Sequence, residues 1–136
     1  MERICSQDLV KKIRWHDHVR PHIPAEERNG PAREIYHLDN KAYICLAYVN
    51  KIPNDETTLF SSPCGSIVVA YTVWSTEKGK GREIILGTRD MIKKAKRFTR
   101  LVTLSPKTTM ALKFHLSNGA KKFRENESSY NFEYDL

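Results

Sequence analysis

The sequence predicts an α/β protein built on one mixed sheet, and three observations predict it. The continuous apolar segment from Ser66 to Trp74 is typical of a central strand that is covered on both faces. A polar turn follows it, and apolar residues then recur at helical spacing from Ile84 onward. Before it, Glu34–His37 and Ala42–Val49 are rich in β-branched and aromatic residues, and Asp39-Asn40 between them predicts an antiparallel hairpin.

Length and composition favour a single domain that spans residues 1–136. A chain of 136 residues can bury a core without disulfides or a metal, and 40% hydrophobic content is that of a globular protein. Cys5, Cys45 and Cys64 are widely spaced and include no CxxC pair, which favours reduced thiols over a disulfide framework or a zinc cluster. The chain has no long apolar run and no signal-like start, so we expect a cytoplasmic protein without membrane contact.

Shorter elements are expected before the long strand. Ile4-Cys5 ends a first strand, and Ser6 is the N-cap of a helix with Leu9, Val10 and Ile13 on one face. The segment from His16 to Pro31 contains three prolines and many charges, which predicts a loop or a broken helix. Residues 50–64 are expected to form a long polar connection.

The predicted helix that contains Ile84 is followed by a strand, a helix and two more strands. Leu101 to Leu104 form the first of these strands. Ser105-Pro106 is expected to open the next helix as its N-cap and first residue, and Asn118-Gly119 to close it. Lys121–Arg124 and Tyr130–Tyr134 then read as two strands joined by a turn.

The turn Lys78-Gly79-Lys80-Gly81 has the composition of an anion-binding site. Where a strand runs into a glycine-containing turn and a helix, several backbone N–H groups point at one spot that the helix dipole makes positive. A pyrophosphate fits such a spot; a solvated surface turn is the alternative interpretation. The turn is neither a dinucleotide fingerprint, because Ile84 stands at the third glycine, nor a P-loop, because no G-K-[ST] follows.

Two segments resemble the GNAT superfamily of N-acetyltransferases. Gly79-Lys80-Gly81-Arg82-Glu83-Ile84-Ile85 is similar to the family's [Q/R]-x-x-G-x-[G/A] turn and R-x-L-L helix start. Thr76 stands at the glutamine or arginine in this register; a register shifted by two would place Lys78 there and Glu83 at the last small position. The segment from Met110 to Ala120 is similar to its A-x-x-x-Y-x-x-x-G-F helix end, with His115 at the tyrosine. The resemblance implies a GNAT-like fold, in which a mostly antiparallel sheet is splayed at the acyl-CoA site and flanked by helices. Compact chains of this type resemble ones carried by bacterial viruses, which implies the host cytoplasm as the location.

The resemblance also implies a reaction, the transfer of an acetyl group from acetyl-CoA to an amine of a small molecule or a protein. The backbone from Val73 to Ser75 would hold the pantetheine arm and polarise the thioester carbonyl. His115 stands where the family's tyrosine protonates the leaving thiolate, a task that suits an imidazole with a near-neutral pKa; a histidine that only packs is the alternative. The residues expected to bind acetyl-CoA are Val73, Trp74, Ser75, Lys78, Gly79, Lys80, Gly81, Arg82, Glu83 and Ser105, and helix capping explains Ser105 equally well.

The general base and the histidine-rich loop are less well defined. No carboxylate lies in the central strand, so Glu34, Asp39 and His37 are the candidates to accept the amine proton, and a water molecule is the alternative. The loop also carries histidines at positions 16, 18 and 22. Because a proline breaks any regular ligand face, we expect no metal site there; acceptor recognition and a solvated loop remain the two interpretations.

The net charge of +7 predicts an anionic partner, either a phosphorylated cofactor or a nucleic acid. Two alternatives to the transferase therefore remain. One is a GNAT-like protein that modifies nucleic-acid bases, with lysine and arginine contacting phosphates. The other is an acyl-CoA-binding module without catalysis, suggested by the missing tyrosine and base. The sequence is compatible with a monomer or a homodimer.

Overall fold

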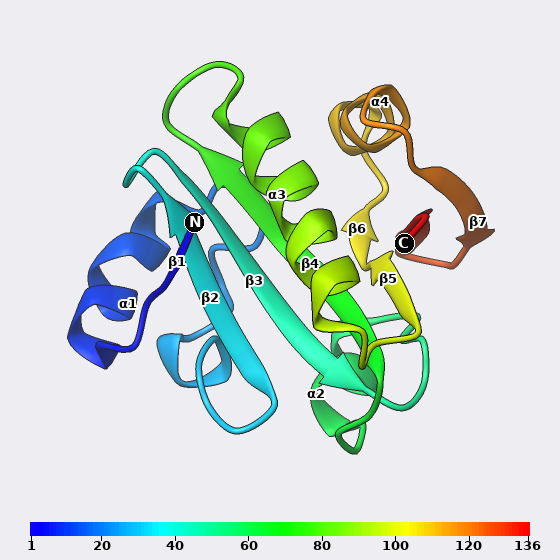
Figure 1. Cartoon of the computed structure of the whole chain (residues 1–136), viewed down its shortest axis with the longest axis horizontal. Helices are drawn as coiled ribbons and strands as arrows, with labels where there is room; N and C mark the ends of the chain where they lie inside the picture. Colours follow the sequence, from blue (N-terminus) through cyan, green and yellow to red (C-terminus); the bar gives the residue numbers. More distant parts are fainter.

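A computed structural model describes all 136 residues and arranges them on one mixed, mostly antiparallel sheet (Figure 1). Its strands follow the order β1-β2-β3-β4-β5-β8-β6, and β7 pairs with β8. The strands are β1 (Glu2–Arg3), β2 (Arg33–Leu38), β3 (Ala42–Val49), β4 (Ile67–Ser75), β5 (Arg100–Thr103), β6 (Ser105–Pro106), β7 (Lys121–Glu125) and β8 (Ser129–Tyr134). The helices are α1 (Gln7–Ile13), α2 (Glu56–Ser61), α3 (Lys80–Ala95) and α4 (Thr109–Ser117), with single 3₁₀ turns at Arg14–His16 and Ala25–Glu27.

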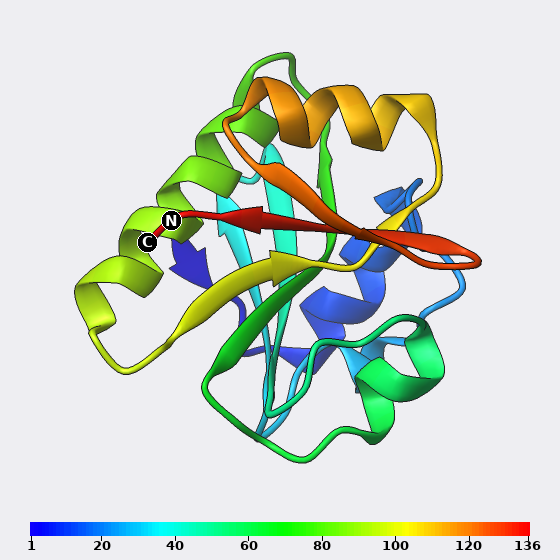
Figure 2. The ribbon, with the colours of Figure 1, turned by 90° about the vertical axis from the view of Figure 1, so that its right-hand side faces the viewer.

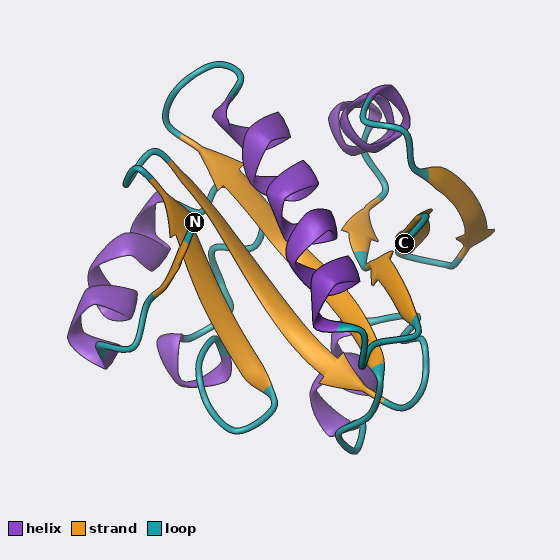
Figure 3. Cartoon of the chain, in the orientation of Figure 1, coloured by secondary structure: helices purple, strands orange, loops and turns teal.

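Helices cover both faces of this sheet, with α3 on one side and α1 and α2 on the other (Figures 2 and 3). The α3 face is closed by a core that contains Ile84, Ile85 and Ile92, all buried. The opposite face is closed by Val10 and other apolar residues of α1 and the loop after it. Strand β3 is buried along its whole length, as its continuous apolar sequence requires. No helix of the chain combines the length and the apolar character that a bilayer crossing requires.

Most predicted elements are confirmed. Ser6 caps α1 by accepting a hydrogen bond from Leu9 N at 3.3 Å. Strands β2 and β3 form the predicted hairpin, and its turn places Asp39 and Asn40 at a φ of 54°, a left-handed conformation that these two residue types tolerate. Strand β1 lies at Glu2–Arg3, slightly earlier than predicted.

Two predictions about local structure are wrong. The connection of residues 50–64 contains α2, which Asp55 and Thr58 start with a reciprocal capping box. Ser105-Pro106 does not open a helix: it is extended as β6, where Ser105 pairs with Tyr130. Thr108 is the true N-cap of α4, because its hydroxyl accepts a hydrogen bond from Ala111 N at 3.1 Å. A Ser-Pro pair suits both roles locally, and the pairing with β8 decides between them.

The sheet is splayed beside β4, as the resemblance implies. The parallel β4–β5 ladder ends at the pair Ala70–Thr103, although β4 continues to Ser75. The register of β4 against β3 skips Tyr71, so this residue is an extra one in β4, a β-bulge. A bulge bends a strand and increases its twist. It occurs directly after the last residue paired with β5. Figure 2 shows β4 (green) and β5 (yellow) running apart.

A buried arginine fills the start of the gap between the two strands. Arg20 donates from Nε to Tyr71 O at 2.8 Å and from Nη2 to Leu104 O at 2.9 Å. Its third donor, Nη1, pairs with Glu56 of α2. These two carbonyl groups lie on the parting strands, where a continued ladder would have satisfied them. Arg20 therefore replaces the missing ladder hydrogen bonds and holds the splay open.

Candidate functional site

The splay opens into a cleft of about 400 Å³ between β4 and the segment formed by β6 and α4. Its floor is the part of β4 from Tyr71 to Ser75, and Gly81 at the start of α3 lies at one end. Ser105 and His115 line the opposite wall, and His18 and Val19 of the loop after α1 line the mouth. The lining is predominantly apolar and contains no Asp or Glu side chain. Such a cleft suits a mostly apolar ligand that makes a few polar contacts.

The start of α3 presents free backbone donors beside this cleft. Gly79 is the N-cap, has a φ of 88° that favours glycine, and offers no side-chain cap. The first bond of the helix runs from Glu83 N to Gly79 O, so the amides of Gly81 and Arg82 have no acceptor within the chain. A Cβ at Gly81 would lie 3.4 Å from Phe114 Cε1 and 3.6 Å from Ser75 Oγ. A Cβ would therefore be in ordinary van der Waals contact with these two side chains, and the two free amides beside the positive end of the α3 dipole suit an anionic group.

The structure brings together only part of the set predicted to bind acetyl-CoA. Val73, Trp74, Ser75, Gly81 and Ser105 line the cleft. Lys78, Gly79, Lys80, Arg82 and Glu83 do not line it but surround the start of α3.

Two of these outer residues are held by other side chains. Lys80 pairs with Asp39 at 3.3 Å and with Glu83 at 3.2 Å. Arg82 donates to Asn118 Oδ1 at 2.8 Å and so ties α3 to the end of α4. Neither Lys78 nor Arg82 pairs with a carboxylate of the chain, so the positive charges of these two side chains are uncompensated, whereas Asp39 and Glu83 compensate that of Lys80.

His115 lies in the wall of the cleft and is 6% exposed. Its Nδ1 lies 2.7 Å from the Tyr134 hydroxyl, and its ring stacks on Phe132 with centroids 4.9 Å apart. Burial lowers the pKa of His115 to about 4, so the expectation of a near-neutral pKa is wrong. Trp74 Nε1 is the one buried side-chain polar atom without a partner. His115 Nε2 also has no partner, but it is not among the buried atoms, so Nε2 of His115 is exposed to the cleft that this residue lines.

Burial of His115 predicts a stability that depends on pH. The folded-state pKa of about 4 lies below the ordinary 6.5, so the unfolded chain binds the proton more tightly between these values. The contribution of His115 to the free energy of unfolding is therefore fully present above pH 6.5. It decreases by about 3 kcal/mol as the pH falls to 4. Urea unfolding of His115→Phe between pH 7 and 4.5 should show a shallower pH dependence than the parent. The exposed His16→Gln variant should keep the parent slope; equal slopes in all three proteins would contradict this account.

None of the predicted base candidates lies in the cleft. Glu34 accepts hydrogen bonds from the hydroxyls of Tyr36 and Tyr48 on another part of the sheet. Asp39 pairs with Lys80, and His37 Nδ1 accepts from Asn40 N at 3.1 Å. The structure instead places His18, an exposed imidazole, at the mouth of the cleft.

The histidine-rich loop does not form a metal cluster. His22 Nε2 lies 2.7 Å from Glu56 Oε1, and the structure contains no group of three metal-ligating side chains. The loop is fixed by Asp17, which is 1% exposed and accepts hydrogen bonds from Val19 N at 2.8 Å and from Thr72 Oγ1 at 3.0 Å. Asp17 thus anchors His18 and Val19 against β4.

Sequence reasoning missed Asp17, Arg20, Arg28, Thr72 and Tyr134. Arg28 pairs with Asp17 at 2.8 Å, and both side chains are fully buried. Asp17, Arg20 and Arg28 lie in a loop rich in charges and prolines, which has the composition of a solvated segment. Tyr134 carried a weak signal, because it belongs to an alternating aromatic strand; its contact with His115 appears only in the fold.

Comparison with known proteins places this fold among acetyltransferase structures. No protein-family model matches the chain, and no curated protein matches its sequence. The GNAT domain of S. lividans PAT superposes with a TM-score of 0.67 over 99% of this chain and 89% of that one, at 10% identity. The PaiA N-acetyltransferase of Thermoplasma acidophilum, solved in complex with coenzyme A, gives 0.53 over 76% and 60% at 15% identity.

A malonyl-CoA decarboxylase from Agrobacterium vitis is also similar in structure. It superposes with a TM-score of 0.62 at 20% identity over 77% of this chain, which spans only 32% of that protein. At such identities the likeness concerns the fold alone. The chain has the fold of the GNAT acetyltransferases.

Proposed function

We propose that the chain binds acetyl-CoA in the splayed cleft and transfers the acetyl group to an amine of a small molecule or a protein. The observation that carries this proposal is the cleft between β4 and the segment formed by β6 and α4, with the unpaired amides of Gly81 and Arg82 at one end. These amides and the α3 dipole would hold the diphosphate. The free edge of β4 from Val73 to Ser75 would pair with the pantetheine arm, in place of the strand that has moved away.

The residues of the cleft divide the remaining tasks. The His115 imidazole, neutral because burial lowers its pKa to about 4, would carry its proton on Nε2 when Tyr134 donates to Nδ1. It would then act as a hydrogen-bond donor to the developing thiolate, not as a charged acid. Ser105 would contact the amide groups of the arm. His18 at the mouth would accept the proton that the attacking amine loses.

The proposal is tested by binding and by product formation. Acetyl-CoA at 100 times its dissociation constant should add about 2.7 kcal/mol to the free energy of unfolding. Mass spectrometry of a panel of small amines and lysine-containing peptides should then detect an added acetyl group. Acetyl-CoA that binds without acetylating any amine would favour a non-catalytic module; no stabilisation at all would contradict the proposal.

The role of His18 makes a separate prediction. His18→Gln should lower kcat by about 10²-fold or more, because a positioned base contributes that much, while the dissociation constant of acetyl-CoA stays unchanged. His16→Gln alters an exposed histidine of the same loop that lies outside the cleft and should leave kcat unchanged. If both variants keep full activity, the amine proton leaves by another route.

The lining of the cleft favours a second candidate, the decarboxylation of a carboxylated acyl-CoA. No Asp or Glu side chain lies in the cleft to accept an amine proton, and a decarboxylation does not need one. Ser105 and His115 would donate to the thioester oxygen, on which negative charge develops as carbon dioxide leaves, and water would supply the proton that the α-carbon then takes up. One similar structure is that of a malonyl-CoA decarboxylase. Release of carbon dioxide from malonyl-CoA, with no acetylation of any amine, would select this candidate.

A further inference from the structure

A second hollow lies at the other end of β4. It has a volume of about 640 Å³ and is formed by the loops on either side of α2 together with β5 and β7. Ile67 at the start of β4 lines it, whereas Ser75 at the end of β4 lines the cleft. The cleft is lined by β4 from Ala70 onward, so along this strand the two linings come within roughly 10 Å of each other. The hollow, called here the Arg124 hollow, nevertheless shares no lining residue with the proposed acetyl-CoA site.

The Arg124 hollow is lined by donors and by no carboxylate. Three of its side chains are cationic, namely Lys51, Arg100 and Arg124, and most of the others are hydroxyls or amides. Several donor atoms of this lining have no acceptor within the chain. They are Lys51 Nζ, Arg100 Nη1, Arg124 Nη1, Asn50 Nδ2, Asn54 Nδ2 and Ser61 Oγ. An excess of free donors beside fixed positive charge suits an oxyanion such as a phosphate.

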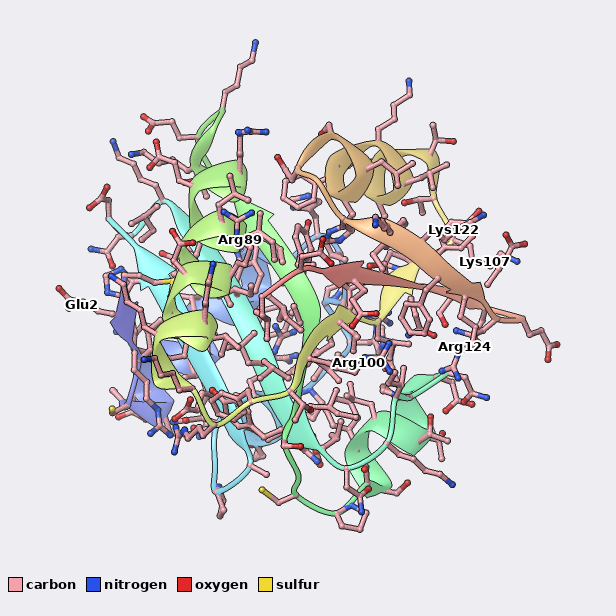
Figure 4. All side chains as sticks on the ribbon, turned by 45° about the vertical axis from the view of Figure 1, so that its right-hand side comes forward. Glu2, Arg89, Arg100, Lys107, Lys122 and Arg124 are labelled. Carbon is pink, nitrogen blue, oxygen red and sulfur yellow. The ribbon has the colours of Figure 1, made fainter.

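The two arginines are held in place before any ligand arrives. Arg124 donates from Nε to Asn131 Oδ1 at 2.9 Å and from Nη2 to Pro53 O at 3.1 Å. No carboxylate pairs with it, so its charge is uncompensated. Arg100 makes a two-bond contact with Glu133, at 2.8 and 2.7 Å, which neutralises its charge but leaves Nη1 free. Figure 4 shows Arg100 and Arg124 on the same side of the molecule, with Arg124 beside α2.

An exposed aromatic ring adjoins the hollow. Phe123 of β7 is 38% exposed, and both guanidinium groups lie against its ring, with Arg100 at 5.2 Å and Arg124 at 5.9 Å from the centroid. One exposed ring beside a donor-lined hollow does not provide the apolar face that a membrane would need. It does match the combination of base and phosphate in a nucleotide.

We propose that the Arg124 hollow binds the phosphate group of a nucleotide, either free or within a single nucleic-acid strand. Lys51, Arg124 and the hydroxyl and amide donors contact the phosphate oxygens, and the base stacks on Phe123. The negative charge of the bound phosphate compensates the positive charge of Arg124. Nothing in this proposal requires acetyl transfer at the other end of β4, so a result against one proposal leaves the other unchanged.

Binding is tested at 150 mM salt with inorganic phosphate, AMP and a short single-stranded oligonucleotide. AMP should bind about tenfold more tightly than phosphate, because stacking of one base adds to the phosphate contacts. Backbone NMR signals of residues 50–54 should shift on titration, whereas those of Gly79 to Arg82 should not. An oligonucleotide that displaces AMP from these residues identifies a nucleic-acid strand as the ligand; one that does not identifies the free nucleotide.

Variants localise the site. Lys51→Glu reverses an exposed charge of the hollow and should weaken AMP binding about tenfold. Lys12→Glu makes the same charge change on the exposed face of α1 and should alter the affinity for AMP by less than about twofold. Phe123→Ala should remove the roughly tenfold difference in affinity between AMP and inorganic phosphate. The proposal would be overturned if Lys51→Glu and Lys12→Glu lost equal affinity for AMP, or if Phe123→Ala still bound AMP more tightly than phosphate. Failure of every probe to bind saturably would also overturn it.

Discussion

Gly81→Val is expected to weaken the binding of acetyl-CoA by about a hundredfold or more. The amides of Gly81 and Arg82 have no acceptor within the chain, and each charge-assisted bond that they would make to a diphosphate contributes about 1.5–3 kcal/mol. A Cβ at Gly81 lies 3.4 Å from Phe114 Cε1 and 3.6 Å from Ser75 Oγ, both in the lining of the cleft, so the two additional methyl groups of valine would crowd this end of the cleft. Isothermal titration of acetyl-CoA into the parent and the variant measures the loss.

The matched control for this variant is Gly87→Val in the same helix. A Cβ at Gly87 meets only Met1 Sδ, at 4.0 Å, and the residue does not line the cleft. Both variants replace a helical glycine with the same β-branched residue, so their intrinsic effects on α3 are similar. We expect the control to bind acetyl-CoA like the parent. A hundredfold loss in both variants would mean that the helix, not the amides, is responsible.

Arg28→Ala is expected to lower the free energy of unfolding by about 3–5 kcal/mol. The Arg28 side chain is fully buried and donates to Asp17 at 2.8 Å and to Arg20 O at 2.8 Å. Removing one partner of a buried ion pair leaves the other charge uncompensated, which is strongly destabilising. Asp17 also holds the loop that carries His18, so the loss should affect the mouth of the cleft first. Urea unfolding at pH 7 measures the change.

Arg3→Ala is the control for this prediction. Arg3 pairs with Glu34 at 3.1 Å, but its side chain is 39% exposed. Ion pairs of this kind contribute about 0–1 kcal/mol because water screens them. If Arg28→Ala cost no more than Arg3→Ala, the buried network would not be what positions the loop after α1.

The sheet and its main helix were predictable because their signals are local. The apolar run of β4, the turn at Gly79 and the helical spacing after Ile84 each lie within one short segment of sequence. Those signals also placed the start of α3 beside the end of β4. By contrast, α2 has only six residues and depends on its capping box. A helix this short has too few apolar positions to show a period.

The walls of the cleft were less predictable because long-range contacts determine them. Arg20 satisfies Leu104 O, a residue 84 positions away in the chain, and the pairing of Ser105 with Tyr130 extends β6. Neither partner shows this from its own neighbours in sequence. The pKa of His115 likewise depends on burial by residues of β8. Motif position suggested which histidine lies in the cleft, but only the packing determines its charge.

The central claim is that coenzyme A lies along the free edge of β4 with its diphosphate on the start of α3. Backbone amide NMR during a titration with coenzyme A tests it most directly. The account predicts the largest shifts at Val73 to Ser75 and at the amides of Gly81 and Arg82, together with slower hydrogen exchange of those two amides. Saturable binding that leaves these amides unchanged and shifts residues elsewhere would contradict it.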